Sequence, residues 1–269
     1  MMYDELQDDL KGNPVQERRN LLKSTVAAQQ PAIGIWCSLA NPLTTEIVAG
    51  SGADWILIDG EHSPNDLRSI VVQLQVAAAF PCEAVVRVPS DDPTFIKQVM
   101  DGGARSLMVP NIRTAEQARA VVAAMTYAPG GFRGFSMAQR ANGFGRIAGY
   151  HANARVHQFL ALQIECETGV ANAAAIAAVP GVDALFVGPG DLSANMGAMG
   201  NPDAAPVQGA IASVLAAART AGKSAGILAP VRADAQRYLA AGFTMVAVGS
   251  DLGLLARGSD ALVSAFKPA

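Results

Sequence analysis

The chain has 269 residues, of which 51% are hydrophobic and 16% are charged, and its net charge at pH 7 is −3. This composition excludes an intrinsically disordered protein, and an acidic balance without runs of Lys and Arg argues against a nucleic-acid partner. No window holds 18 consecutive apolar residues, so we expect no membrane-spanning helix.

The N-terminus and the cysteines indicate a cytoplasmic protein. The first residues are acidic and lack the apolar stretch of a secretion signal. Cys37, Cys82 and Cys166 are odd in number and have no CxxC spacing, which supports neither a disulfide framework nor a thiolate zinc site. We interpret them as small buried apolar side chains.

Residues 1–30 are polar and mixed in charge, and the pattern changes at Pro31. We expect these residues to form a short N-terminal extension outside the main domain, with one or two amphipathic helices, of which residues 15–28 are the best candidate. Residues 31–269 are predicted to form one domain.

From residue 32 onward, short aliphatic runs alternate with Ala-rich stretches of helical spacing. The expected strands cover residues 33–38, 55–59, 84–88, 106–110, 159–165, 184–187, 224–228 and 245–249. The helices expected between them include residues 66–79, 114–125, 170–178, 206–221 and 233–241.

Apolar strands that alternate with helices predict a parallel sheet covered by helices. Eight strand–helix units in about 240 residues fit a (β/α)8 TIM barrel in number and length. A doubly wound open sheet is the alternative, but it usually has fewer strands, and no GxGxxG follows the first predicted strand. We therefore predict an α/β TIM barrel with a short N-terminal helical extension.

In such a barrel the active site lies at the C-terminal ends of the strands. The predicted strand ends and the residues just beyond them carry mostly polar groups: Trp36, Asp59, Glu61, His62, Arg87, Gln163, Glu165, the run 188–191, Leu228, Ser250 and Asp251. A scaffold without chemistry would have little need of these groups, so we expect the functional site at this rim.

Glu165 and Asp191 follow two neighbouring predicted strands. Two carboxylates without a nearby His or Cys suit an oxygen-preferring divalent ion that keeps several waters, namely Mg, Mn or Co. The alternative is structural: Asp191 would cap the turn that starts at Leu192, and Glu165 would pair with an arginine. The residues alone leave both interpretations open.

Asp59 and His62 are three residues apart in a loop that begins at Gly60. This spacing allows Asp59 to accept from one imidazole nitrogen, so that the other nitrogen can take a proton. Alternatively, His62 packs in the loop while Asp59 accepts loop amides. 

Arg87 ends an apolar strand, where a cation is costly unless an anion meets it. A substrate carboxylate or enolate oxygen would supply that anion, and an internal acid is the alternative. Farther along the chain, the Gly-Pro-Gly run at 188–190 places backbone N–H groups beside Asp191, which predicts a cradle for a small carboxylate.

None of the five lysines lies at a predicted strand C-terminus, and Lys223 precedes its strand at the opposite rim. An aldolase that forms a Schiff base needs an amine inside the barrel at the catalytic end. The lysine positions therefore argue against Schiff-base chemistry.

Several stretches are specific in combination: residues 54–67 (DWILIDGEHSPNDL), 86–87 (VR), 96–98 (IKQ), 101–104 (DGGA), 163–165 (QIE), 188–193 (GPGDLS) and 221–223 (AGK). Together they resemble the HpcH/HpaI family of metal-dependent class II pyruvate aldolases, and most of all its 4-hydroxy-2-oxoheptanedioate aldolase branch. The resemblance covers about residues 32–267 in order.

By this resemblance Glu165 and Asp191 bind the divalent metal ion. His62 with Asp59 would be the acid/base dyad, and Arg87 would contact the pyruvyl or enolate oxygen. Further substrate contacts are expected from Gln163, from the amides of Gly190 and Asp191, and from the rim residues Trp36 and Leu228.

The resemblance also implies a homohexamer, a dimer of trimers, whose last helix packs on a neighbouring subunit. Asp101 is expected at the end of the third helix, where its charge faces the negative end of the helix dipole and needs an offset. The resemblance implies that Asp101 reaches into a neighbour's substrate pocket, and a solvated surface carboxylate is the alternative.

The implied reaction is the reversible cleavage of a 4-hydroxy-2-oxo acid, such as 4-hydroxy-2-oxoheptanedioate, to pyruvate and an aldehyde through a metal-stabilised enolate. A superfamily lyase or decarboxylase acting on an acyl-CoA or an oxaloacetate-like acid is the nearest alternative, and a non-catalytic binding barrel is a remote one. Residues 1–30 lie outside the family core, and loop 137–144 lacks the basic, aromatic character expected for the branch, which leaves the aldehyde open.

Overall fold

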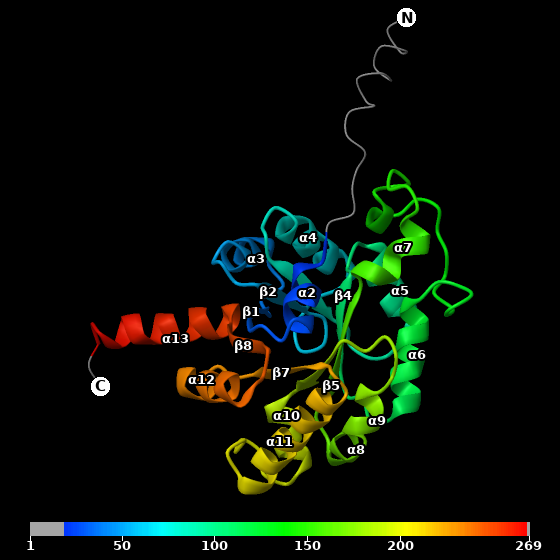
Figure 1. The fold of residues 1–269 in the computed structure, drawn as a ribbon. Coiled ribbons are helices and arrows are strands. Elements are labelled where there is room, and N and C mark those ends of the chain that lie inside the picture. Colours follow the sequence, from blue (N-terminus) through cyan, green and yellow to red (C-terminus); the bar gives the residue numbers. More distant parts are fainter. Residues whose placement is uncertain (1–18, 268–269) are drawn as a thin grey trace, which may run out of the picture.

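The structure, a computed structural model, describes residues 19–267 and is built around a closed parallel barrel whose eight strands follow one another in chain order (Figure 1). Each expected strand is present with ends that differ by at most one residue, so the predicted TIM barrel is confirmed. The strands are β1 (Ala32–Cys37), β2 (Trp55–Asp59), β3 (Glu83–Arg87), β4 (Ser106–Val109), β5 (Phe159–Ile164), β6 (Ala184–Val187), β7 (Ser224–Leu228) and β8 (Met245–Ser250).

Helices surround the barrel, and none of those in the described range is long and apolar enough to cross a membrane. They are α2 (Leu21–Ala27), α3 (Pro42–Ala49), α4 (Leu67–Ala77), α5 (Pro93–Asp101), α6 (Ala115–Met125), the 3-10 helix η1 (Arg140–Asn142), α7 (Tyr150–His157), α8 (Glu167–Ala171), α9 (Ala173–Ala177), α10 (Pro189–Asn195), α11 (Ala205–Thr220), α12 (Arg232–Ala241) and α13 (Asp251–Ser264).

The continuous helix expected over residues 170–178 is wrong. Two short helices, α8 and α9, meet at Asn172, whose backbone is not helical. The side chain of Asn172 donates from Nδ2 to the carbonyl of Arg113 at 2.8 Å. A side chain that hydrogen-bonds to backbone elsewhere competes with helix continuation, which explains the break.

Aromatic side chains fill the barrel interior. Trp36, Trp55 and Phe186 lie with their ring centroids 5.7–6.3 Å apart, in tilted or edge-on contacts. Gly34 lies opposite Trp55 in the ladder of β1 and β2, and a Cβ atom there would be 2.1 Å from the indole ring. A glycine is therefore required beside the largest interior side chain.

Helix α2 closes the N-terminal end of the barrel. Its Leu22 and Val26 are buried in the same cluster as the interior aromatic rings. This part of the N-terminal segment therefore packs on the barrel, which corrects the expectation that all of residues 1–30 lie outside it. Residues 1–18 lie outside the described range, and so does the first part of the helix expected over 15–28.

Helix α13 extends away from the barrel (Figure 1). Asp251 is its one buried residue, and this carboxylate accepts from the backbone N–H groups of Ser38 at 2.8 Å and Leu39 at 3.2 Å. Apolar side chains along the helix are more than half exposed, namely Leu252, Leu254, Leu255, Leu262 and Val263. The helix is thus anchored at its base, and most of its apolar surface has no cover within the described chain.

Candidate active site

Asp59 and Arg87 form a buried ion pair at the C-terminal ends of neighbouring strands. The register of β2 and β3 sets the two residues opposite each other. Arg87 donates from Nε and Nη2 to the two oxygens of Asp59, at 2.9 and 2.7 Å. Burial by itself would raise the pKa of Asp59, but the hydrogen bonds and positive charge of Arg87 outweigh it and hold this pKa below its usual value. Asp59 is therefore an anion that holds the guanidinium in place.

The loop after β2 is organised around the same carboxylate. Asp59 Oδ1 accepts from the backbone N–H groups of Glu61 at 3.0 Å and His62 at 3.3 Å. The His62 side chain is 61% exposed, and its ring lies beside Glu61, with 3.8 Å between Nε2 and Glu61 Oε2. The expected contact between Asp59 and the imidazole is therefore not formed, because Arg87 and the loop amides occupy Asp59.

Glu61, which had no predicted role, is the second acid on Arg87. Its Oε2 lies 2.9 Å from Arg87 Nη1, and its side chain is 21% exposed. Burial raises the pKa of Glu61, and the charge of Arg87 opposes part of that rise. The anions that meet Arg87 are thus internal, which was the alternative to a substrate oxygen. The one signal in the sequence was the place of Glu61 between Asp59 and His62 at a strand end.

Trp36 forms the floor beneath this ion pair. The centre of the Arg87 guanidinium lies 5.4 Å from the centroid of the Trp36 ring, a cation–π contact. Trp36 is 5% exposed, so most of its surface packs in the barrel and only an edge can meet a ligand. Leu228, at the end of β7, is partly buried against the same interior cluster.

Glu165 and Gln163 present unpaired oxygens at the end of β5. Glu165 Oε1 accepts from the backbone N–H of Asn111 at 2.7 Å, a contact that sequence reasoning missed because it depends on the loop after β4. Glu165 Oε2 and Gln163 Oε1 are buried and have no hydrogen-bond partner among residues 19–267. A Cβ atom at Gly188 would lie 2.7 Å from Glu165 Oε2, so only glycine leaves this space open.

The pKa of Glu165 is raised to about 7. Burial is the largest cause, and the negative charges of Asp191 and Glu61 add to it. The Asn111 amide and the charge of Arg87 oppose the rise without cancelling it. A carboxylate in this position lacks a cation, and no arginine pairs with it in the described part of the chain.

Asp191 lies in the first turn of α10 and follows Gly190, whose backbone faces open space. The helix begins after Gly188, so Asp191 is its third residue and does not cap it, contrary to the structural alternative. Asp191 and Gly190 are exposed, and a Cβ atom at Gly190 would meet nothing within 4 Å. The first amides of a helix have no partner within the helix, so this backbone can receive a carboxylate.

The rim therefore carries more negative than positive charge. The charge of Arg87 acts on three carboxylates, Asp59, Glu61 and Glu165. Asp191 is a fourth carboxylate, and its negative charge acts on Glu61 and Glu165. No group of three or more His, Cys, Asp and Glu suited to a metal ion occurs in the range that the structure describes. Two protein carboxylates, Glu165 and Asp191, are thus the donors that could hold a cation, with water or substrate at its remaining positions.

Asp101 and the lysines lie away from this rim. Asp101 ends α5 at the other end of the barrel, where it accepts from Nη2 of the buried Arg133 at 2.7 Å. The helix-dipole cost of Asp101 is therefore offset within the chain, so that argument does not require a neighbouring subunit. The lysines of the described range are Lys23 on α2, Lys97 on α5, Lys223 before β7 and Lys267 after α13.

Residues 32–258 match the family model described as HpcH/HpaI aldolase/citrate lyase. The chain belongs to this family. It is 46% identical over 248 residues to the 5-keto-4-deoxy-D-glucarate aldolase of Klebsiella pneumoniae, an alignment that covers 92% of this chain and 97% of the relative. With relatives of this kind, the chain is a carbon–carbon lyase of the aldolase type.

Solved structures of the family have the same barrel. An HpcH/HpaI aldolase/citrate lyase family protein from Burkholderia cenocepacia is 38% identical, with a TM-score of 0.89 over 92% of this chain and 99% of that protein. The citrate synthase SbnG is 26% identical, with a TM-score of 0.82 over 91% of this chain and 96% of that protein. The expected family is thus confirmed, whereas the named relatives are sugar-acid aldolases rather than members of the heptanedioate branch.

We expect Glu165→Gln to stabilise the metal-free aldolase at pH 8. The pKa of Glu165 rises from 4.5 to about 7 on folding, so the folded state loses stability as pH rises through this window, and the full cost is present above pH 7. The neutral amide avoids that cost, on the order of 3 kcal/mol at pH 8 and much less at pH 5. Urea unfolding at both pH values, with chelator present, measures the difference.

The exposed Glu46→Gln on α3 is the matched control, with no pH-dependent gain expected. A Glu165→Gln protein no more stable than wild type at pH 8 would show that Glu165 already has a partner.

Proposed function

We propose that this aldolase cleaves 4-hydroxy-2-oxo acids to pyruvate and an aldehyde, with a divalent metal ion held by Glu165 and Asp191. The observation that carries the proposal is the buried Glu165 Oε2, which has no partner within residues 19–267 and faces further negative charge. A divalent cation supplies that partner. An octahedral ion such as Mg, Mn or Co accepts two carboxylates and keeps positions for water and substrate.

When bound, the ion supplies Lewis-acid stabilisation of the developing enolate charge. Arg87 adds a fixed positive charge beside the developing enolate. Its guanidinium is held by two hydrogen bonds to Asp59 and by its contact with the Trp36 ring. A guanidinium held in this way needs no reorganisation when negative charge develops on the substrate. The amides of Gly190 and Asp191 hold the carboxylate of the 2-oxo acid, and Gln163 offers a polar contact beside it.

His62 moves the proton. Directly or through a water, its imidazole takes the proton of the C4 hydroxyl while the C3–C4 bond breaks and the aldehyde leaves. The remaining pyruvate enolate then takes one proton at C3, from the His62 imidazolium or from solvent in exchange with it, so that the cleavage has no net change in protons. Glu61 lies beside the His62 ring and is the carboxylate placed to stabilise the imidazolium, whereas Asp59 acts on Arg87 and on the loop backbone.

We propose a hydroxylated sugar diacid as the substrate, in preference to 4-hydroxy-2-oxoheptanedioate. The support is the 46% identity to 5-keto-4-deoxy-D-glucarate aldolases. Counted from its keto end, the compound in that name is a 4-hydroxy-2-oxo acid, and cleavage between C3 and C4 releases pyruvate and a three-carbon hydroxy-aldehyde acid. The reaction type is therefore the same for both substrates, and the aldehyde is what differs.

The proposed function predicts metal-dependent cleavage without a covalent lysine adduct. We expect chelator to abolish pyruvate release from 5-keto-4-deoxy-D-glucarate, and Mg, Mn or Co to restore it. The heptanedioate should be cleaved more slowly. Treatment with pyruvate and borohydride should leave the protein mass unchanged, because no lysine of the described range lies at the rim. A lysine-bound adduct, or full activity in chelator, would overturn the proposal.

We expect His62→Ala to lower kcat by roughly 10²–10⁴-fold, the contribution of a positioned acid/base group. Binding of Mn to the variant, measured by calorimetry, should persist because His62 is not a proposed ligand. His151→Ala is the matched control, since that ring lies on α7 beside the carbonyl of Ser136, and its activity should stay near wild type. Near-normal turnover by His62→Ala would show that the histidine only packs in its loop.

We further propose a homohexamer, a dimer of trimers, in which α13 of one subunit covers a neighbour. The support is the exposed apolar surface of α13, a helix that extends from the barrel (Figure 1). Leu43 and Ile47 on the adjacent α3 are also exposed, by 67% and 74%, and extend this surface. Within such an assembly, Asp101 would reach a neighbour's substrate pocket while Arg133 orients it.

Two inactive variants test this shared site. Asp101→Ala keeps its own metal site, and Glu165→Ala keeps Asp101, so each alone should be poorly active. Dissociating and reassembling the two variants together should recover part of the activity. The control is Glu165→Ala reassembled with itself. A fully active Asp101→Ala protein, or mixed oligomers that gain nothing, would exclude the shared site.

A further inference from the structure

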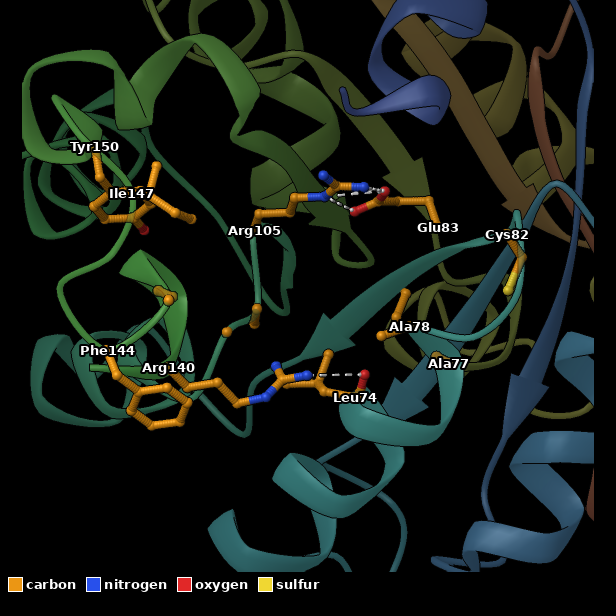
Figure 2. A pocket seen from close by; sticks show the side chains of 15 residues that line it. Leu74, Ala77, Ala78, Cys82, Glu83, Arg105, Arg140, Phe144, Ile147 and Tyr150 are labelled. Atoms are coloured by element: carbon orange, nitrogen blue, oxygen red, sulfur yellow. Dashed lines mark hydrogen bonds and ion pairs between the residues drawn. The ribbon is translucent and has the colours of Figure 1, made fainter. Parts of the chain in front are cut away.

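A cavity of about 410 Å³ lies at the start of β3 and β4, away from the catalytic rim (Figure 2). One side is formed by the end of α4 and the first residues of the two strands, and the other by the segment 140–150. None of its lining residues belongs to the candidate active site, which lies at the opposite ends of the same strands. A ligand in this cavity would therefore be remote from the candidate active site.

The charged groups of the cavity leave a positive excess. Arg105 donates from Nη2 to Glu83 at 2.5 Å, which balances those two charges. Arg140 is half-buried, and its guanidinium donates to the backbone carbonyls of Gly102 at 3.0 Å and Leu74 at 3.5 Å. No carboxylate of the described residues pairs with Arg140, and burial lowers its pKa. The cavity thus suits an occupant that brings carboxylates.

Apolar side chains make up much of the remaining wall. Leu74 and Ala77 come from α4, and Phe144 and Ile147 lie on the facing segment (Figure 2). Phe144 is 62% exposed, and the Arg146 guanidinium lies 5.8 Å from the centroid of its ring. An occupant with apolar side chains among its acids would bury this surface.

The described chain begins beside this cavity. Asn20 donates from Nδ2 to Ser106 Oγ at 2.8 Å and to the carbonyl of His157 at 3.0 Å. Ser106, the first residue of β4, directly follows Arg105 of the cavity wall, and α7, which ends at His157, contributes Tyr150 to that wall. Asn20 therefore lies near the edge of the cavity, and each residue of extended chain before it would add about 3.3 Å of reach.

The composition of residues 1–18 complements the cavity. Four acids, Asp4, Glu5, Asp8 and Asp9, fall within the first nine residues, which contain no Lys or Arg. The apolar residues Tyr3, Leu6 and Leu10 are interspersed among them. Acids for Arg140 and apolar side chains for the wall are thus available on a segment that starts next to both.

We propose that residues 1–18 bind in this cavity of their own chain, with a carboxylate on Arg140 and apolar side chains against Leu74 and Phe144. The bound segment would join the N-terminal end of the barrel to the segment 140–150 and hold that segment in place. A small acidic metabolite is the competing occupant, and the experiments below separate the two.

Photo-crosslinking of the full chain tests the contact directly. We expect Phe144→p-benzoylphenylalanine to crosslink to residues 1–18, identified by mass spectrometry after proteolysis. Phe135→p-benzoylphenylalanine is the matched control, because Phe135 is equally exposed, at 64%, but does not line the cavity. Mixing light chains with chains labelled with heavy nitrogen distinguishes a contact within one chain from a contact between chains.

Hydrogen exchange tests the charge pairing. Neutralising the four acids to Asn or Gln should speed amide exchange in residues 140–150 about five-fold or more, because it removes their pairing with Arg140. Replacing Arg140→Gln should also speed this exchange, since it removes that pairing together with the hydrogen bonds to the carbonyls of Gly102 and Leu74. Arg119→Gln is the control, an arginine on α6 that is 57% exposed and lies outside the cavity wall, and it should leave exchange in residues 140–150 unchanged.

Crosslinks from Phe144 only to other segments or to a second chain would overturn the proposal. So would exchange that responds to Arg140→Gln but not to loss of the acids, or a small acidic molecule found in the cavity by native mass spectrometry.

Discussion

The ion pair between Asp59 and Arg87 is the interaction on which the catalytic rim depends. It exists because β2 and β3 pair in register, which sets the last residues of two neighbouring strands opposite each other. Both side chains are almost fully buried, so removing Arg87 would leave the charge of Asp59 uncompensated and cost about 3–5 kcal/mol. The same carboxylate holds the loop that carries Glu61 and His62. The register of β2 and β3, the orientation of Arg87 and the loop that carries His62 are thus linked.

Around this ion pair, the rim has more carboxylates than positively charged groups. Arg87 already has internal anions, so its charge does not neutralise Glu165, which keeps a raised pKa and an oxygen without a partner in the described chain. Burying a carboxylate in this way lowers stability unless a cation arrives. The buried Glu165 oxygen that causes this loss of stability lies next to Gly188, and the backbone at the following Gly190 has open space beside it. The raised pKa of Glu165 and the metal site proposed beside it thus have the same cause, a buried carboxylate oxygen without a partner in the described chain.

The two ends of the barrel differ in polarity and in how they are closed. At the C-terminal ends of the strands, polar groups converge on open space, whereas α2 and its apolar side chains close the N-terminal end. The cavity at the start of β3 and β4 lies at this closed end and is bordered by the segment that also carries Arg140. Asp101, Arg133 and this segment occupy the same side of the molecule. The cavity is therefore separated from the candidate active site by the length of the barrel strands.

The sequence by itself determined the eight strands, because buried parallel strands are continuous apolar runs, and it located Glu165, Asp191, Arg87 and His62 at the predicted rim. It could not determine which acid meets Arg87, because that depends on the register of two strands. The roles of Asn111 and Glu61, the unpaired oxygen of Glu165 and the cavity beside Arg140 likewise follow from contacts between residues distant in the chain. Periodicity reports local burial, whereas partners are set by tertiary geometry.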